Sequence, residues 1–202
     1  MEKKIDKTID KTGVRIGMWL FLYTEIILFG GLFVLYAVYF HKFPELFAQG
    51  GEELNKVVGT VNTAILLISS FTVAASITAV QRGKKRQTIS LLLFSICCGA
   101  VFLVNKYFEW SAKFHHDIFP NSATLQDGPD GLNIFFGLYY VVTGLHALHV
   151  IIGMLLLTIT LVLVIKERVH KDRFQLLENS GLYWHLVDLI WIFVFPLFYL
   201  VL

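Results

Sequence analysis

Five histidine and acidic side chains lie near the middle of long apolar stretches of the sequence. They are Glu25, His146, His149, His185 and Asp188. Imidazole and carboxylate groups can bind metal ions or transfer protons, so their spacing determines which chemistry is open to them. His146 and His149 are three residues apart, as are His185 and Asp188, and in a helix each pair shares a face. Within the second pair, the carboxylate could accept a hydrogen bond from the imidazole of its own helix.

These five residues are poorly suited to binding a metal ion. His146 and His149 on one helical face cannot hold a haem iron from opposite sides, although either could pair with His185 in a single site. A centre built from haem and copper needs more imidazoles than these three. We therefore expect no catalytic residue, no metal and no cofactor in this chain. The open alternatives are hydrogen bonds that fix helix packing, contact with lipid headgroups, and a direct role in proton relay.

The elements that position these residues are long apolar stretches, at 16–40, 57–80, 87–110, 132–165 and 177–201. Each is long enough to cross a bilayer, which takes about 20 helical residues. Lipid offers the backbone no hydrogen bonds, so each stretch must be helical. The sequence predicts an all-α integral membrane protein, with a charged cytoplasmic tail at 1–15 and a single domain of five transmembrane helices at 16–202.

The five polar residues share one depth. Glu25 lies about 14 Å from the start of the first stretch, and the others also lie near the middle of theirs. An ionised group there costs on the order of 2.5–3.5 kcal/mol on insertion scales, so these side chains should face protein, headgroups or water. Small residues nearby would allow helices to approach closely. They are Gly30, Gly31, Gly144, Ala147 and Gly153.

Basic residues are unevenly divided between the two ends of the predicted helices. One end has 13 of the 17: Lys3, Lys4, Lys7, Lys11, Arg15, Arg82, Lys84, Lys85, Arg86, Lys166, Arg168, Lys171 and Arg173. The other end has Lys42, Lys56, Lys106 and Lys113. The positive-inside rule therefore predicts a cytoplasmic N-terminus and an outside C-terminus.

Two smaller charged groups have separate interpretations. The loop cluster of Arg82, Lys84, Lys85 and Arg86 could attract anionic lipid on the cytoplasmic face. Lys106 and Glu109, near the outer end of the third stretch, are expected to form an ion pair that reaches the membrane interface. The net charge of +2 is too small to suggest a nucleic-acid partner.

Four stretches resemble the signature segments of subunit III of haem–copper terminal oxidases, in the same order and over nearly the whole chain. They are "IGMWLFLYTEIILFGGLF", "VNTAILLISSFTVAASITAVQRG", "GLYYVVTGLHALHVIIGM" and "YWHLVDLIWIFVFPLFYL". The length is similar to that of the short bacterial form, which lacks the first two helices of seven-helix members. Many of those members have a carboxylate where this chain has Arg82, so any proton-collecting role of that carboxylate does not transfer.

The resemblance implies a non-catalytic subunit without redox cofactors, in the bacterial inner (cytoplasmic) membrane. Its implied partners are subunit II and the catalytic subunit I, with haem and copper in the partner subunits, and it would bind phospholipid and support proton uptake and sustained turnover. By position, Glu25 matches the family's acidic residue in the first motif. His146 and His149 match its paired histidines, and His185 with Asp188 matches its "WHxxD".

Two other functions stay open at this stage. Related proteins accompany nitric-oxide reductases, and nothing in this sequence separates that partner from an oxidase. A free-standing proton-coupled transporter could also use buried acids and imidazoles. The absence of an inverted repeat and of helices broken at matching positions argues against the transporter.

Overall fold

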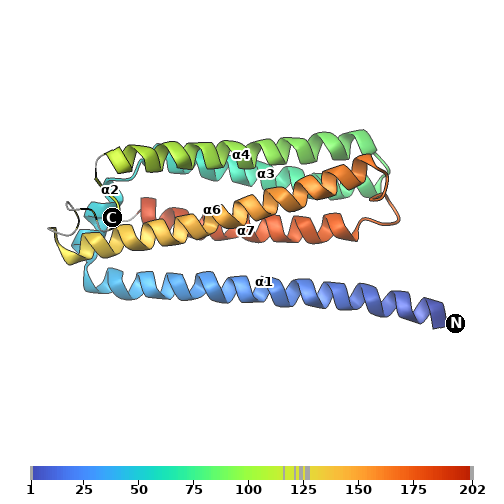
Figure 1. Cartoon of the computed structure of the whole chain (residues 1–202), viewed down its shortest axis with the longest axis horizontal. Coiled ribbons are helices and arrows are strands. Elements are labelled where there is room, and N and C mark those ends of the chain that lie inside the picture. The colour runs from blue at the N-terminus through green and yellow to red at the C-terminus, as the bar shows by residue number, and fades with distance from the viewer. Residues whose placement is uncertain (1, 116, 121, 123–124, 126–127, 201–202) are drawn as a thin grey trace.

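The computed structural model describes residues 2–115, 117–120, 122, 125 and 128–200, with the backbone alone for residues 2–11. These ranges contain the helices α1 (Glu2–Lys42), α2 (Pro44–Glu52), α3 (Lys56–Gln81), α4 (Lys85–His115), α6 (Asp130–Ile165) and α7 (Gln175–Tyr199). No strand occurs in the same ranges (Figure 1). All helices except α2 are long and apolar enough to cross a membrane, with the span of α1 counted from Thr12. The predicted all-α fold with five spanning helices is confirmed.

The short helix α2 has no counterpart among the predicted elements. It begins at Pro44, whose fixed φ suits a first helical turn and whose missing N–H would have no partner there. Phe47 is fully buried, with ring centroids 5.2 Å from Tyr36 of α1 and 5.3 Å from Phe135 of α6. Nine residues give little periodic signal. The packing of Phe47 against two longer helices therefore explains α2 better than its local pattern does.

Two helices extend beyond the predicted stretches. α1 runs without a break from Glu2 to Lys42, so the helix includes the charged segment that precedes residue 16. α4 continues past residue 110 to His115. Its final turns are charged, but the Lys113 side chain is buried and its Nζ donates to the Glu53 carbonyl oxygen at 3.0 Å. The Glu53 carbonyl thus gives the buried Lys113 ammonium a hydrogen-bond partner inside the protein.

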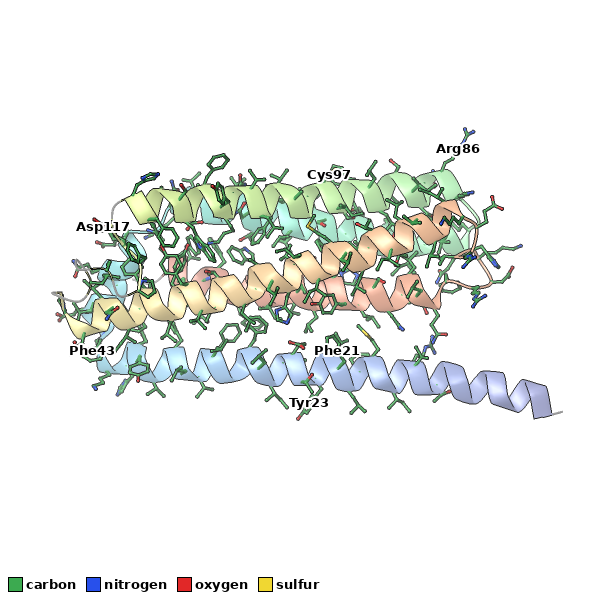
Figure 2. The ribbon with its side chains drawn as sticks, in the orientation of Figure 1. Phe21, Tyr23, Phe43, Arg86, Cys97 and Asp117 are labelled. Carbon is green, nitrogen blue, oxygen red and sulfur yellow. The ribbon has the colours of Figure 1, made fainter. Side chains whose placement is uncertain are left out.

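The helices form three layers (Figure 1). α3 and α4 pack together, α6 and α7 lie in the middle, and α1 contacts α6, α7 and α2 but, among the described residues, neither α3 nor α4. The outward face of α1 is consequently exposed. Figure 2 shows Tyr23 projecting away from the other helices, and this residue is 61% exposed. Phe21 stacks on Tyr183 of α7, with ring centroids 5.9 Å apart.

Trp184 of α7 joins three helices at the centre of the bundle. Its side chain is fully buried, and its indole N–H donates to the Ser69 hydroxyl of α3 at 3.0 Å. Glycines on the two neighbouring helices make room for the ring. A Cβ at Gly153 of α6 or at Gly99 of α4 would lie 2.8 Å from a carbon of this indole. Both positions therefore need glycine because the helix backbone approaches the ring directly.

The predicted close approaches occur at some small residues only. Gly153 lies against Trp184, and a Cβ at Gly144 would be 3.3 Å from the ring of Trp110 on α4. At Gly30 and Gly31 of α1, a Cβ would meet no atom within 4 Å among the described residues outside the local helix backbone. The prediction is wrong for that glycine pair because α1 touches only one side of the bundle.

The loops at one end of the bundle are tied together. α3 ends at Gln81, and two residues later Gly83 has a left-handed φ of +70°. The Lys84 N–H donates back to the Ala79 carbonyl at 2.9 Å. Lys85 then reaches the α6–α7 loop, where its Nζ lies 2.8 Å from Glu167 Oε1. The hydrogen bond and charge of Lys85 lower the pKa of the Glu167 carboxyl. The N-terminus of α1 lies at the same end (Figure 1).

Candidate functional site

The first polar contact inside the bundle joins α1 to α6. His149 Nε2 lies 2.9 Å from Glu25 Oε2, and His149 Nδ1 lies 2.7 Å from the backbone oxygen of Leu145. Both partner side chains are largely buried, at 9% and 13% exposed. Phe29 packs edge-on against the imidazole with ring centroids 5.3 Å apart. Two of the predicted midplane residues are therefore brought together, and they link the outlying helix α1 to the middle layer.

The predicted hydrogen bond between His185 and Asp188 is wrong. His185 Nδ1 instead lies 2.6 Å from the hydroxyl oxygen of Ser70, which joins α7 to α3. Asp188 is 3% exposed, and among the described residues neither of its carboxyl oxygens has a hydrogen-bond partner. The spacing of His185 and Asp188 allows them to share a face of α7, but the His185 imidazole hydrogen-bonds to the Ser70 hydroxyl on α3 instead. Ser70 gives no signal in the sequence, because nothing marks it among the other serines.

His146 has different surroundings from its neighbour His149. It is fully buried, and neither ring nitrogen has a hydrogen-bond partner among the described residues. Its ring lies between Phe102 of α4 and Trp191 of α7, with centroids 5.5 Å and 5.1 Å away. Within the described ranges, no three histidine, cysteine, aspartate or glutamate side chains are placed to share a metal ion. The paired histidines thus have different partners: His149 contacts Glu25 of α1, whereas His146 packs against rings of α4 and α7.

Lys106 and Glu109 form an ion pair, but in the interior of the bundle. Lys106 is 3% exposed, and its Nζ lies 3.2 Å from Glu109 Oε2. The same Nζ donates to the hydroxyl oxygens of Tyr139 at 2.9 Å and Tyr199 at 2.8 Å. Both tyrosine hydroxyls donate to Glu109 Oε1, at 2.8 Å and 2.6 Å. We call these four residues the lysine–tyrosine cluster; it contains the predicted ion pair, which is buried among α4, α6 and α7.

The sequence offered a weak signal for this cluster. Tyr139 and Tyr199 each lie in an apolar helix, and a buried phenol needs a hydrogen-bond partner. The two tyrosines stand 33 and 93 residues from Lys106 in the sequence, too far for any local pattern to reveal the contact. Lys106 also lies 5.5 Å from the ring centroid of Trp191, which adds a cation–π contact. Three helices, α4, α6 and α7, therefore supply one buried ionic group.

Comparison with known proteins identifies the family. A family model described as cytochrome c oxidase subunit III matches residues 4–201. The chain belongs to this family. The match includes all five membrane-spanning segments, the first of which begins at Thr12. It also includes the Glu25–His149 pair and the lysine–tyrosine cluster. The resemblance drawn from the four sequence stretches is confirmed.

Relatives of subunit III type occur both alone and fused. The heme-copper oxidase subunit I+III of Aeropyrum pernix is 33% identical over 200 residues, which cover 95% of this chain and 23% of that protein. The cytochrome c oxidase subunit 3 of Thermostichus vulcanus is 32% identical over 190 residues, covering 92% of this chain and 86% of the relative. The subunit 3 of Coturnix japonica is 34% identical over 201 residues, covering 95% and 70%.

The basic cluster of this subunit III family member lies at the turn between α3 and α4. Arg82, Lys84 and Arg86 are exposed. Lys85 is half-buried and engaged with Glu167 at 2.8 Å, so one of the four cations already has a partner. Figure 2 shows Arg86 projecting away from the bundle at the start of α4. Three cations are therefore available to an anionic surface.

Proposed function

We propose that this chain is a non-catalytic subunit of a proton-pumping haem–copper terminal oxidase in a bacterial inner membrane. It packs against the catalytic subunit I, beside subunit II, and haem and copper are bound by those partners. It binds phospholipid and supports proton uptake and sustained turnover. The observation that carries the proposal is the match to the subunit III family over residues 4–201. A relative named as a subunit I+III fusion supports direct association with subunit I.

The structure offers a surface suited to that association. α1 is packed on one side only, and its other side presents large apolar side chains, among them Trp19 and Leu20, both 63% exposed. In a membrane-spanning helix this face meets either lipid or another subunit. We infer that subunit I covers part of it. The Glu25–His149 pair, at 2.9 Å, would then hold α1 in position for the contact.

We further propose that the N-terminus is cytoplasmic. The α3–α4 turn, the α6–α7 loop and the N-terminus of α1 lie at one end of the bundle, and these are the segments rich in lysine and arginine (Figure 1). The positive-inside rule supports the cytoplasm for that end. Arg82, Lys84 and Arg86 would there meet anionic lipid, each adding about 1 kcal/mol of attraction near the surface.

The experiment that tests this function compares oxidase complexes purified with and without the chain. The initial rate of oxygen consumption per haem should be similar in the two preparations, because this subunit holds no catalytic group. Activity should then decay faster during turnover in the preparation that lacks the chain, and re-expression should restore its lifetime. Equal decay would refute a role in sustained turnover. A partner complex that contains haem but no copper would favour the nitric-oxide reductase alternative.

A further inference from the structure

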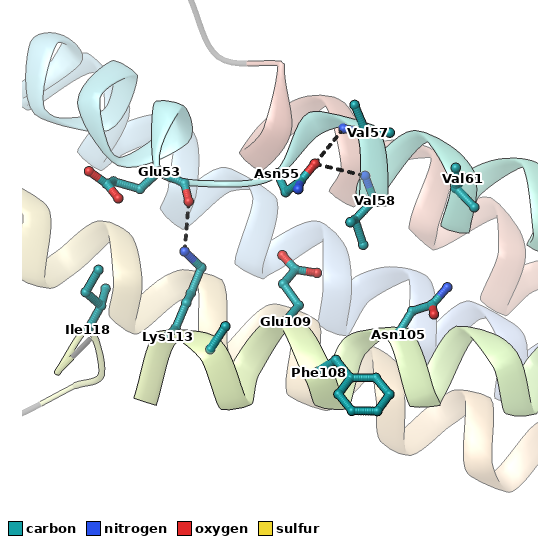
Figure 3. A pocket seen from close by; sticks show the side chains of 11 residues that line it. Glu53, Asn55, Val57, Val58, Val61, Asn105, Phe108, Glu109, Lys113 and Ile118 are labelled. Carbon is teal, nitrogen blue, oxygen red and sulfur yellow. Dashed lines mark hydrogen bonds between the residues drawn. The ribbon is translucent and has the colours of Figure 1, made fainter. Parts of the chain in front are cut away.

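A groove of about 920 Å³ opens between the start of α3 and the end of α4. Figure 3 shows Lys113 and Glu109 reaching into it from α4, and Asn55, whose side chain caps the start of α3, on the opposite side. The groove lies at the opposite end of the bundle from the basic cluster, and neither Glu25 nor His149 lines it. It is therefore separate from the polar contacts that link α1 to the bundle.

The outer wall of the groove is apolar and faces away from the protein. Val57 and Val61 of α3 are 71% and 48% exposed, and Phe108 of α4 is 65% exposed. These residues belong to helices that cross the membrane, so lipid is the surrounding medium on this side. A ligand that enters from the bilayer would keep hydrocarbon against this wall.

The inner end of the groove combines opposite charges. Lys113 is 7% exposed, and its Nζ donates to the Glu53 carbonyl oxygen at 3.0 Å. An ammonium has three N–H donors, so two are left for an anion. Glu109 lies one turn earlier on α4 and accepts one hydrogen bond from Lys106 and two from tyrosine hydroxyls. A carboxylate has about four acceptor positions, which leaves one for a cationic group.

The balance of charge indicates the class of headgroup. The charged residues that line the groove are two acids, Glu53 and Glu109, and one lysine, Lys113. Lys106 stands directly behind Glu109, at 3.2 Å. The four charges cancel, so a headgroup with net negative charge would gain little, whereas one with both a phosphate and an ammonium would find a partner for each.

We propose that this groove binds one zwitterionic glycerophospholipid with a primary amine. The phosphate lies on the Lys113 ammonium, the amine points toward the Glu109 carboxylate, and the acyl chains follow the wall of Val57 and Phe108. The inference rests on the proposed phospholipid binding and deepens it, because it assigns a site for one lipid and selects among lipid classes.

The test uses the assembled membrane complex and a photoactivatable phosphatidylethanolamine, with mapping of the cross-linked peptides. Labelling should concentrate in residues 53–61 and 105–113. Lys113→Gln, which keeps a donor for the Glu53 carbonyl but removes the charge, should reduce this labelling about tenfold, as expected for loss of one charge-assisted hydrogen bond. Ala112→Phe, at an exposed position lining the groove, should block entry without disturbing the interior.

Matched controls come from α1. Lys42→Gln removes a lysine near the same end of the bundle, and Ala37→Phe adds a ring at an exposed position; neither residue lines the groove. Both should leave the labelling unchanged. Unlabelled phosphatidylethanolamine should compete with the probe, and phosphatidylglycerol should compete poorly at the same concentration.

Three results would overturn the proposal. Labelling spread evenly over the lipid-facing helices would mean unselective boundary lipid only, as would labelling that neither Lys113→Gln nor Ala112→Phe alters. Equal competition by phosphatidylglycerol would refute selection of the amine. Co-purification of the haem-bearing subunit is measured in every sample, so loss of the lipid site in an intact complex is distinguished from failure of the subunit assignment.

Discussion

At the scale of single residues, the hydrogen bonds of His149 fix the number of protons that it shares with Glu25. Its Nδ1 faces the Leu145 carbonyl at 2.7 Å, and a carbonyl only accepts, so Nδ1 carries a hydrogen. The 2.9 Å contact between Nε2 and Glu25 then needs one further proton, on the ring or on the carboxyl. The pair has no net charge in either case. This explains how two ionisable groups can lie at the middle of a membrane-spanning bundle.

The coupling between these two residues is measurable. His149→Ala or Glu25→Ala alone should destabilise the chain by about 3–5 kcal/mol, because each leaves an unpaired buried group. The double variant should lose less than the sum, with a coupling energy of about 0.5–3 kcal/mol. Unfolding of the purified chain in detergent, followed by tryptophan fluorescence, gives all four values. Strict additivity would show that the contact contributes nothing, and Ile26→Ala on the exposed face of α1 serves as the control.

The lysine–tyrosine cluster makes a second prediction at this scale. Lys106→Met leaves the Glu109 carboxylate without a counter-charge and should destabilise the chain by about 3–5 kcal/mol. Adding Glu109→Gln removes the remaining charge and keeps an acceptor for the hydroxyls of Tyr139 and Tyr199, so the double variant should recover most of the loss. The same unfolding measurement applies. A double variant less stable than Lys106→Met alone would contradict the assignment.

At the scale of elements, the spanning helices could be predicted because lipid leaves an apolar run no other way to satisfy its backbone. The contacts between helices could not. The depth of Glu25 and His149 in their apolar stretches marks both as candidates. Their contact with each other depends on how α1 packs against α6, which the sequence does not show. Ser70 and Tyr199 carry no local signal, so the partners of His185 and Lys106 emerge only from the folded bundle. Helix α2 was missed because tertiary packing of Phe47 outweighs its short local pattern.

Helix packing at Trp184 can be tested with paired glycine substitutions. Gly153→Ala places a Cβ 2.8 Å from the buried indole and should destabilise the bundle by about 1–3 kcal/mol through overpacking. Gly30→Ala, where a Cβ meets nothing within 4 Å, should be neutral or slightly stabilising because alanine favours a helix. The midpoints of thermal unfolding provide the comparison. Equal midpoints for the two variants would show that α6 does not approach α7 closely at this site.

At the scale of the whole molecule, four of the spanning helices pack closely together and the fifth, α1, is packed on one side only. α3, α4, α6 and α7 pack around the buried tryptophans of α7, and they form the most closely packed part of the bundle. α1 is held from one side, mainly through Glu25, Phe29 and their neighbours, and presents its other face outward. Such an exposed apolar face can contact a larger catalytic partner in the membrane. In the absence of a partner, the same face would contact lipid.

The most direct measurement is a mild-detergent pull-down of the tagged chain from its native membrane, with a reduced-minus-oxidised spectrum, a copper assay and identification of the co-purifying polypeptides. We expect haem absorbance and copper together with a large catalytic subunit, in constant proportion to the chain. A Lys42→Gln variant should give the same result, since that residue has no part in the bundle's buried contacts. A chain that emerges alone and colourless after gentle extraction would contradict the account.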